Sequence, residues 1–115
     1  SIQVTATCVR VPVMGGHSES VNMEFVREPN LAEVRAALHS FPGLVVLDEP
    51  MNFEYPMPLI HAHNSDNVFE GRIRRDESNE HAMNCWIVSD NLRKGAATNA
   101  VQIANYLLER GLIKP

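Results

Sequence analysis

The stretch SVNMEFVREPNLAEVRAALHSFPGLVVLD, residues 20–48, changes its hydrophobic period twice and thereby decides the fold class. Residues 20–27 alternate apolar and polar side chains, which predicts a strand with one buried face. Residues 30–41 carry apolar side chains at helical spacing, and the short apolar run 44–48 predicts another strand. We therefore expect an α+β fold, a mixed β-sheet with helices packed on one face.

The ends of the predicted helix are marked by specific residues. Asn30 followed by Glu33 forms an N-cap pair, in which each side chain satisfies backbone groups at the first turn. Pro42 and Gly43 end the helix. The apolar stripe that should face the sheet consists of Leu31, Val34, Leu38 and Phe41.

The same signals predict the remaining elements. Residues 2–11 are rich in β-branched side chains and predict a strand, as do residues 68–75 and 82–89. Between them, residues 49–67 contain several prolines and asparagines and predict a long irregular connection. A helix is expected over about residues 91–110, where small residues fill the first turns.

Composition limits the classes of function. The chain has 115 residues, about one domain, with 44% hydrophobic and 21% charged residues and no apolar run long enough to span a bilayer, so we expect no membrane partner. The net charge of −4, with only the short basic run 71–75, predicts no nucleic-acid partner. Two cysteines and no signal peptide favour a reducing, cytoplasmic location. Because the chain starts at Ser1 without methionine, we expect a piece of a longer polypeptide.

Arg10 stands at the end of the predicted strand 2–11, on the face that carries Val4, Ala6 and Cys8. A guanidinium at the edge of a core must meet an acid or an anionic ligand, and its planar fork suits a carboxylate. The alternative is an arginine that reaches solvent or pairs with a nearby glutamate, Glu19 or Glu24.

His17 follows Gly15 and Gly16, which allow the backbone to turn and present the imidazole to a cleft. Histidine is the side chain suited to proton transfer near neutral pH. A surface-loop histidine without a task is the alternative reading, since histidines also occur in glycine-rich loops.

Other reactive side chains carry weaker signals. His61 and His63 form a His-x-His pair, and His81 with Cys85 would suit a metal only on a helix, whereas residues 81–88 are predicted to be extended. We therefore expect no metal site. Cys8 and Cys85 are expected to be small buried hydrophobes rather than nucleophiles.

The segment SDNLRKG, residues 89–95, precedes the last predicted helix. Asp90 is a candidate helix cap, and Asn91 would hold its amide beside the helix N-terminus, where a carboxamide or a phosphate could be bound. Simple capping is the alternative for both residues.

Two blocks at opposite ends of the chain, TATCVRVPVMGGHSESVNMEF and WIVSDNLRKGAATNAVQIANYL, resemble the C-terminal part of aspartate-semialdehyde dehydrogenase. The resemblance implies the C-terminal portion of a glyceraldehyde-3-phosphate-dehydrogenase-like catalytic domain. It also implies reductive dephosphorylation of L-aspartyl 4-phosphate with NADPH through a cysteine thioester, in the biosynthesis of lysine, threonine and methionine.

The resemblance implies a role for three residues. Arg10 matches the arginine that binds the substrate carboxylate, His17 matches the catalytic acid and base, and Asn91 matches a cofactor-binding position near the nicotinamide. The partners implied are the small-molecule substrate, the remaining N-terminal part of the enzyme, and further copies in a homodimer or homotetramer.

The resemblance also has departures. The Rossmann domain and the Asn-Cys nucleophile of the family have no counterpart in this chain, and the dipeptide Asn84–Cys85 is read as coincidental. We expect the chain alone to be inactive, with the last helix packing on the N-terminal Rossmann domain. The alternatives are a non-catalytic homologue or dimerisation module and the related N-acetyl-glutamyl-phosphate reductase.

Overall fold

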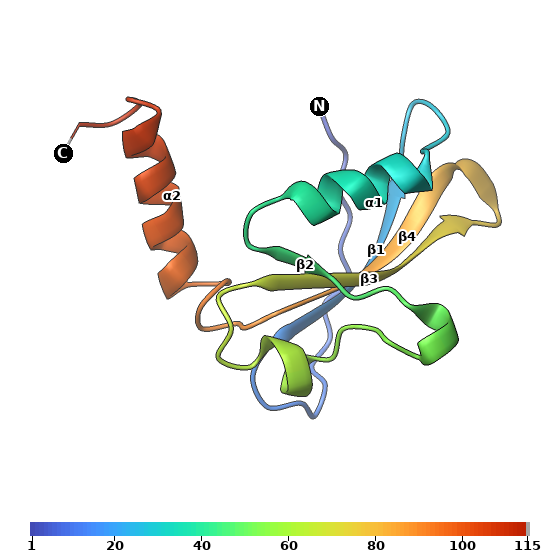
Figure 1. Ribbon diagram of the computed structural model, residues 1–115, viewed down its shortest axis with the longest axis horizontal. Coiled ribbons are helices and arrows are strands. Elements are labelled where there is room, and N and C mark those ends of the chain that lie inside the picture. The colour runs from blue at the N-terminus through green and yellow to red at the C-terminus, as the bar shows by residue number, and fades with distance from the viewer. Residues whose placement is uncertain (115) are drawn as a thin grey trace.

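The computed structural model describes residues 1–114 and contains one four-stranded sheet (Figure 1). The strands are β1 (His17–Glu24), β2 (Leu44–Val46), β3 (Val68–Asp76) and β4 (Asn79–Ser89), and their order in the sheet is β1-β4-β3-β2. β4 is antiparallel to both β1 and β3, whereas β2 and β3 are parallel. The predicted mixed sheet is therefore confirmed.

Two α-helices and two short helical turns complete the fold. These are α1 (Leu31–Ser40), the 3₁₀ turn η1 (Pro50–Asn52), the π-helical turn η2 (Pro58–Ala62) and α2 (Ala97–Glu109). Within residues 1–114, neither α-helix has the length and apolar character that crossing a bilayer requires.

Helix α1 begins and ends where the sequence predicts. The Asn30 side-chain oxygen accepts hydrogen bonds from the backbone N–H groups of Ala32 at 3.0 Å and Glu33 at 3.4 Å. The Asn30 amide in turn donates to the Glu33 carboxylate at 3.1 Å. Phe41 caps the other end in an extended conformation, and Gly43 follows with a φ of 79°. Local capping chemistry thus sets both ends of α1.

The core lies between α1 and one face of the sheet, which α1 crosses in Figure 1. Ile73, Met83 and Cys85 are its buried centre. Because side chains alternate along a strand, the register that pairs Val21 with Cys85 and Met23 with Met83 puts these side chains on the same face. The partly buried residues packed against the centre are Val21, Met23, Leu31, Val34, Leu38, Val46 and Ile87.

A bulge in β3 is held by an ion pair from the neighbouring elements. The pairs Gly71–Trp86 and Arg74–Asn84 enclose three steps along β3 but two along β4, so β3 contains one extra residue. Arg72, at this point, adopts a φ of 53°, a left-handed conformation that costs energy for a residue with a side chain. The bulge turns the backbone groups of Ile73 away from the ladder.

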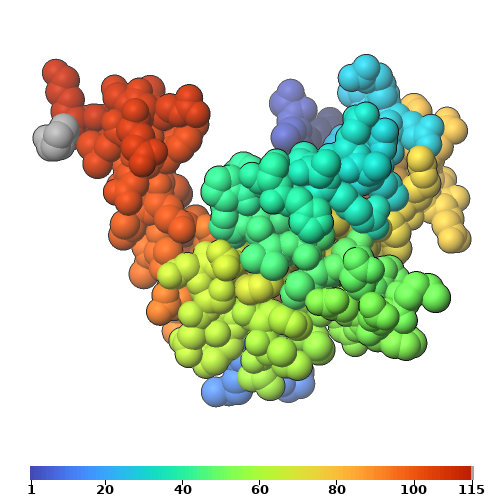
Figure 2. Space-filling view, viewed as in Figure 1, coloured from blue at the N-terminus to red at the C-terminus, as the bar shows by residue number. Residues whose placement is uncertain are grey.

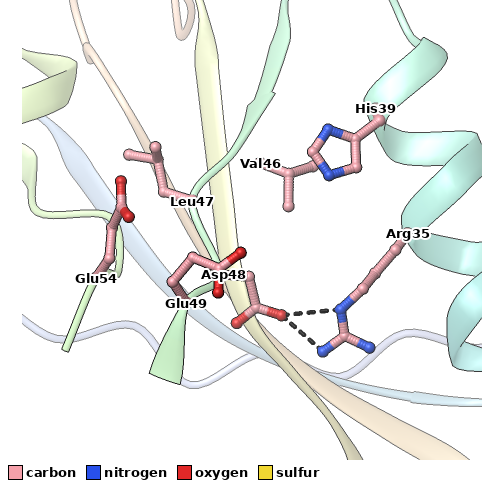
Figure 3. A pocket seen from close by; sticks show the side chains of 7 residues that line it. All are labelled: Arg35, His39, Val46, Leu47, Asp48, Glu49 and Glu54. Atoms are coloured by element: carbon pink, nitrogen blue, oxygen red, sulfur yellow. Dashed lines mark hydrogen bonds and ion pairs between the residues drawn. The ribbon is translucent and has the colours of Figure 1, made fainter. Parts of the chain in front are cut away.

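Arg35 and Asp48 bind those backbone groups. Figure 3 shows the two side chains and the bonds between them. The Ile73 N–H donates to Asp48 Oδ1 at 3.3 Å, and the Ile73 carbonyl accepts from Arg35 Nη2 at 2.5 Å. Arg35 Nε and Nη2 also donate to Asp48 Oδ2 at 3.1 and 2.7 Å. The Asp48 side chain is only 3% exposed. The pair therefore joins α1, the end of β2 and β3.

The long connection 49–67 covers part of the opposite face of the sheet. The Trp86 indole N–H donates to the Pro56 carbonyl at 3.0 Å, and Pro56 is fully buried. The Arg72 guanidinium lies over the Tyr55 ring, 5.6 Å from its centroid. The connection is thus anchored to the sheet, and η1 and η2 are its only helical turns among the described residues.

The predicted strand over residues 2–11 is wrong. These residues form no strand in the structure, and the side chains of Ile2 and Val4 are 93% and 85% exposed. β-propensity describes a side chain that suits a pleated surface, but a strand forms only where a neighbouring strand accepts its hydrogen bonds. The strand predicted for residues 20–27 instead begins at His17, where its pairing with Ser89 starts.

Helix α2 is shorter than expected and stands away from the sheet. Residues 91–96 form turns, so the helix begins at Ala97 rather than near Asn91. None of its residues is buried, and Figure 2 shows it projecting from the rest of the molecule. The predicted packing of α2 on another domain therefore remains a prediction.

The bulge generates a prediction for local stability. Replacing Asp48 with alanine leaves the Arg35 guanidinium and the Ile73 N–H without their partner. We expect the local unfolding free energy of β3 to fall by about 2 kcal/mol, a roughly 30-fold rise in amide hydrogen exchange over residues 68–76. Mass spectrometry of the exchanged peptides measures the change.

The matched control is the exposed ion pair between Arg75 and Glu28, whose side chains are 52% and 55% exposed. Arg75→Gln should change the unfolding free energy by about 0.5 kcal/mol or less, because water screens an exposed pair. Equal exchange rates in Asp48→Ala and Arg75→Gln would contradict the role assigned to Asp48.

Candidate functional site

His17 lies at one end of the sheet, where β1 starts and β4 ends. The backbone register pairs it with Ser89, the last residue of β4. The preceding Gly15 and Gly16 have φ values of 65° and 112°, which residues with a side chain rarely adopt. At Gly16, an added Cβ would lie 3.0 Å from Pro58 Cβ and 3.2 Å from the Ser89 carbonyl oxygen. The two glycines thus allow the tight turn that leads into His17.

Asn91 is brought to the same place by the chain that leaves β4. Its side-chain oxygen accepts a hydrogen bond from the Gly16 N–H at 3.1 Å. No acceptor for the Asn91 amide nitrogen is found among residues 1–114, so its two N–H groups are available to a ligand. The structure therefore brings together two of the three predicted site residues, His17 and Asn91.

Gly95 lies against the imidazole of His17. A Cβ added to Gly95 would be 3.2 Å from His17 Nε2 and 2.9 Å from the Asn91 carbonyl oxygen. Both distances are shorter than ordinary contacts of a Cβ atom. From the sequence, Gly95 is only one of the small residues in the first turns of the last predicted helix. Its contact with His17 was not predicted, because the two residues are far apart in the chain.

Arg10 is not brought into this cluster. It is exposed in the N-terminal segment, and within the described part of the chain it makes no hydrogen bond or ion pair, with Glu19 and Glu24 or any other group. The reason is that residues 2–11 are not paired with the sheet, so nothing directs the guanidinium towards His17. Its predicted role as a carboxylate ligand stays a prediction.

Asp90 makes more hydrogen bonds than its predicted role as a helix cap would require. Its carboxylate is nearly buried, with the residue 4% exposed, and caps the turn 90–95 rather than α2. Oδ1 accepts from the N–H groups of Leu92 at 2.8 Å and Arg93 at 2.9 Å, and Oδ2 accepts from the Asn64 N–H at 2.8 Å. These bonds, led by that of Asn64, lower the pKa of Asp90.

His63 also lies at this end of the molecule. Its Nδ1 would be 3.0 Å from a Cβ added to Gly15. By contrast, His61 Nδ1 accepts the Met57 N–H at 3.0 Å. No group of three or more His, Cys, Asp or Glu side chains within residues 1–114 is arranged to hold a metal ion. The sequence suggested His63 only as half of a His-x-His pair, and nothing in its local sequence indicates the contact with Gly15.

The two cysteines lie outside the cluster. Cys8 is exposed in the N-terminal segment, which contradicts its predicted burial, whereas Cys85 is buried in the core as predicted. Burial and the neighbouring Glu70 carboxylate raise the pKa of the Cys85 thiol to about 12. At neutral pH Cys85 is thus a thiol and not a thiolate, which agrees with reading Asn84–Cys85 as coincidental.

The hollow drawn in Figure 3 is a different feature. It has a volume of about 220 Å³ and surrounds the Arg35–Asp48 ion pair, with His39, Val46, Leu47, Glu49 and Glu54 completing its lining. None of the predicted site residues lines it. Since both polar groups at its centre bind the β3 bulge, we assign it to the scaffold.

The family model that matches the chain is described as "Semialdehyde dehydrogenase, dimerisation domain" and covers residues 1–94. Aspartate-semialdehyde dehydrogenase of Aquifex aeolicus (strain VF5) is 54% identical over 113 residues, which are 98% of this chain and 33% of that protein. The enzyme of the same name from Legionella pneumophila is 48% identical over 114 residues, 99% of this chain and 33% of that protein.

Solved structures agree with these matches. The crystal structure of aspartate semialdehyde dehydrogenase II from Vibrio cholerae superimposes with a TM-score of 0.78 at 38% identity, covering 86% of this chain and 29% of that chain. A probable aspartate-semialdehyde dehydrogenase from Pseudomonas aeruginosa gives a TM-score of 0.76 at 36% identity, covering 84% of this chain and 28% of that chain. The chain spans about a third of the length of the curated relatives it matches.

The buried carboxyl group of Glu70 generates a prediction for pH dependence. Burial is the main cause that raises the pKa of Glu70 above its ordinary value of 4.5. The folded state therefore binds this proton more tightly than the unfolded state does. The contribution of the protonated Glu70 carboxyl group to the free energy of unfolding is complete below pH 4.5. This contribution is lost as pH rises through the pKa that Glu70 has in the folded protein. Glu70→Gln should therefore become more stable relative to wild type as pH rises from 4.5 towards neutrality.

Urea unfolding of wild-type and variant full-length protein at several pH values gives this difference in the free energy of unfolding. Glu80→Gln is the control, because the Glu80 side chain is 83% exposed. A difference between wild type and Glu70→Gln that stays constant with pH would contradict the prediction.

Proposed function

The chain belongs to the semialdehyde dehydrogenase dimerisation-domain family, and from this membership we propose that it is the C-terminal part of the catalytic and dimerisation domain of an aspartate-semialdehyde dehydrogenase. The observation that carries the proposal is the 54% identity to such an enzyme across 98% of the chain. The hydrogen bond that joins Asn91 to the turn before His17 supports it, because it gathers two of the proposed site residues at one end of the sheet.

The proposed reaction of the full-length protein is the reductive dephosphorylation of L-aspartyl 4-phosphate to L-aspartate 4-semialdehyde. NADPH, when bound, supplies the hydride. The pathway served is the biosynthesis of lysine, threonine and methionine, in the cytoplasm. The nucleophilic cysteine and the dinucleotide-binding domain would come from the remaining N-terminal part of the enzyme, so the present chain alone is expected to be inactive.

In this proposal His17 is the acid and base of the reaction. Its imidazole is exposed at the end of β1, where a substrate can approach. A neutral imidazole can take the proton of the nucleophilic thiol, and the imidazolium can then return it during the reaction. The turn made by Gly15 and Gly16 presents the ring at this end of the sheet.

Arg10 is proposed to bind the carboxylate of the substrate. Its guanidinium makes no ion pair within residues 1–114, so no bond to this chain has to be broken before it binds an anion. The fork of N–H groups can donate to both oxygens of a carboxylate. Packing of the N-terminal segment against the rest of the enzyme would fix its position.

Asn91 is proposed to hold the nicotinamide end of NADP. The residues fit such a group, because the Asn91 amide has free N–H donors while its oxygen is held by Gly16. Gly95, Ala96 and Ala97 follow it and leave room for a flat ring. The donors would orient the carboxamide of the cofactor relative to His17.

The proposed macromolecular partners are the N-terminal part of the enzyme and further copies, in a homodimer or homotetramer. Helix α2 exposes a set of large apolar side chains that an isolated helix would not keep in water. We propose that α2 packs on the N-terminal Rossmann domain. The exposed apolar residues on and after the helix are Val101, Ile103, Tyr106, Leu108, Leu112 and Ile113.

The role of His17 predicts a loss of turnover. In the full-length enzyme, His17→Ala should lower kcat by ~10² to 10⁴, as removal of a general acid and base usually does. Steady-state kinetics with L-aspartate 4-semialdehyde, phosphate and NADP measure the effect in the reverse direction. His39→Ala, in the exposed last turn of α1, is the control and should retain wild-type kcat. Near-normal turnover of His17→Ala would instead favour a non-catalytic dimerisation module.

The role of Arg10 predicts weaker substrate binding. Arg10→Leu should raise KM for the semialdehyde by about 10- to 100-fold, because a charge-assisted pair to the carboxylate is lost. Arg10→Lys keeps the charge without the fork and should give an intermediate KM. An unchanged KM in Arg10→Leu would rule out the carboxylate contact.

A further inference from the structure

Three segments that are distant in sequence meet at the end of the sheet where His17 lies. They are the glycine turn 15–16, the end of η2 with residues 63–64, and the turn 90–95. One residue, Asp90, makes hydrogen bonds within the third segment and to the second.

Asp90 determines the shape of the turn that carries Gly95. Its Oδ1 accepts the N–H groups of Leu92 and Arg93, and its backbone carbonyl accepts those of Lys94 at 2.9 Å and Gly95 at 3.3 Å. Both ends of the turn are thus bound to the same residue. Since Asp90 directly follows Ser89, the turn is held at a defined position relative to the end of β4.

The same carboxylate binds the neighbouring loop. Asp90 Oδ2 accepts the N–H of Asn64, which has a φ of 61°, a left-handed conformation that asparagine tolerates better than most residues. This bond holds the backbone beside His63, whose ring lies against Gly15. A second, exposed link joins the same loop to the turn 90–95 and to the start of α2, because Asp66 accepts hydrogen bonds from Arg93 and Thr98.

His17 is held against this assembly from two directions. The β1–β4 register fixes its backbone opposite Ser89, next to Asp90. Gly95 then lies against the edge of the ring that carries Nε2, so closely that a Cβ there would be 3.2 Å away. The position of the ring therefore depends on the turn that Asp90 holds.

We propose that Asp90 is a positioning residue and that Gly95 is the surface against which it positions the His17 imidazole. The inference rests on the proton-transfer role proposed for His17, and it adds two residues to that site. Asp90 does not touch the substrate in this scheme. It holds the turn 90–95 and the loop at Asn64, so that the ring keeps one orientation without being bonded to a carboxylate.

Two substitutions in the full-length enzyme test the inference. Asp90→Asn is nearly isosteric and retains an oxygen for Leu92 and Arg93, but an amide N–H₂ then faces the Asn64 N–H and breaks that link. Gly95→Ala places a methyl group against the His17 ring and the Asn91 carbonyl oxygen. The first removes the support of the turn, whereas the second displaces the ring directly.

The matched control is Asp76→Asn, at the hairpin end of β3. Asp76 resembles Asp90, since one of its carboxylate oxygens accepts the Ser78 N–H at 2.9 Å and the other binds a distant residue, Asn22, at 2.6 Å. It lies at the opposite end of β4 from His17. The control should leave both readouts at wild-type values.

The first readout is the rate at which diethyl pyrocarbonate modifies His17, measured by peptide mass spectrometry, with His39 as the internal reference. Both variants should change this rate severalfold relative to His39. The second readout is steady-state kinetics, in which kcat should fall by ~10-fold or more while KM changes little, because misplacing a catalytic group affects the transition state more than ground-state binding.

The outcomes separate the two proposals. Unchanged reactivity of His17 in both variants, or an equal effect of Asp76→Asn, overturns the positioning role of Asp90 and Gly95. Altered reactivity of His17 with unchanged kcat supports the positioning of the ring and overturns the catalytic role proposed for His17. Altered reactivity with a fall in kcat supports both.

Discussion

The fold depends on the ion pair between Arg35 and Asp48 at the β3 bulge. The bulge takes the N–H and C=O of Ile73 out of the strand ladder, and such groups cannot stay unbonded in a core without a large cost. Asp48 accepts from one group and Arg35 donates to the other, so three elements meet at one point. This brings α1 onto the same face as Ile73 and closes the core around Met83 and Cys85.

Strand β4 connects this core to the end of the sheet where His17 lies. It pairs with β3 on one side and with β1 on the other, so its register aligns His17 with Ser89. Asp90 and Asn91 directly follow the last residue of the same strand, so Asn91 lies beside the turn that precedes His17. The candidate site is thus a product of strand register, with the glycines at positions 15, 16 and 95 removing the side chains that would keep the segments apart.

Two segments of the described chain expose apolar surface, and the chain spans about a third of the length of the curated relatives it matches. The N-terminal segment and α2 both expose large apolar side chains, and both flank the candidate site in sequence, before His17 and after Gly95. In the proposed enzyme, the same partner surface that buries them would also bring Arg10 to the substrate. The proposed site would then be completed when this chain packs against the rest of the enzyme.

The elements whose signals are local could be predicted from the amino-acid sequence alone. Asn30 with Glu33 marked the start of α1, and the strand-like runs 68–75 and 82–89 located β3 and β4, because capping and strand signals involve residues close in the chain. The family blocks also indicated His17 and Asn91 as site residues, although their roles remain proposals.

The pairings between distant segments could not be predicted in this way and are known only from the folded structure. The run 2–11 has the composition of a strand, but it pairs with no other strand of the described residues. Helix α2 begins at Ala97 and not near Asn91, because Asp90 closes a separate turn before it. The bulge at Arg72 and the contact of Gly95 with His17 leave no trace in the local pattern. Each depends on a hydrogen bond or a steric contact between residues far apart in sequence, whose energy exists only once the chain has folded.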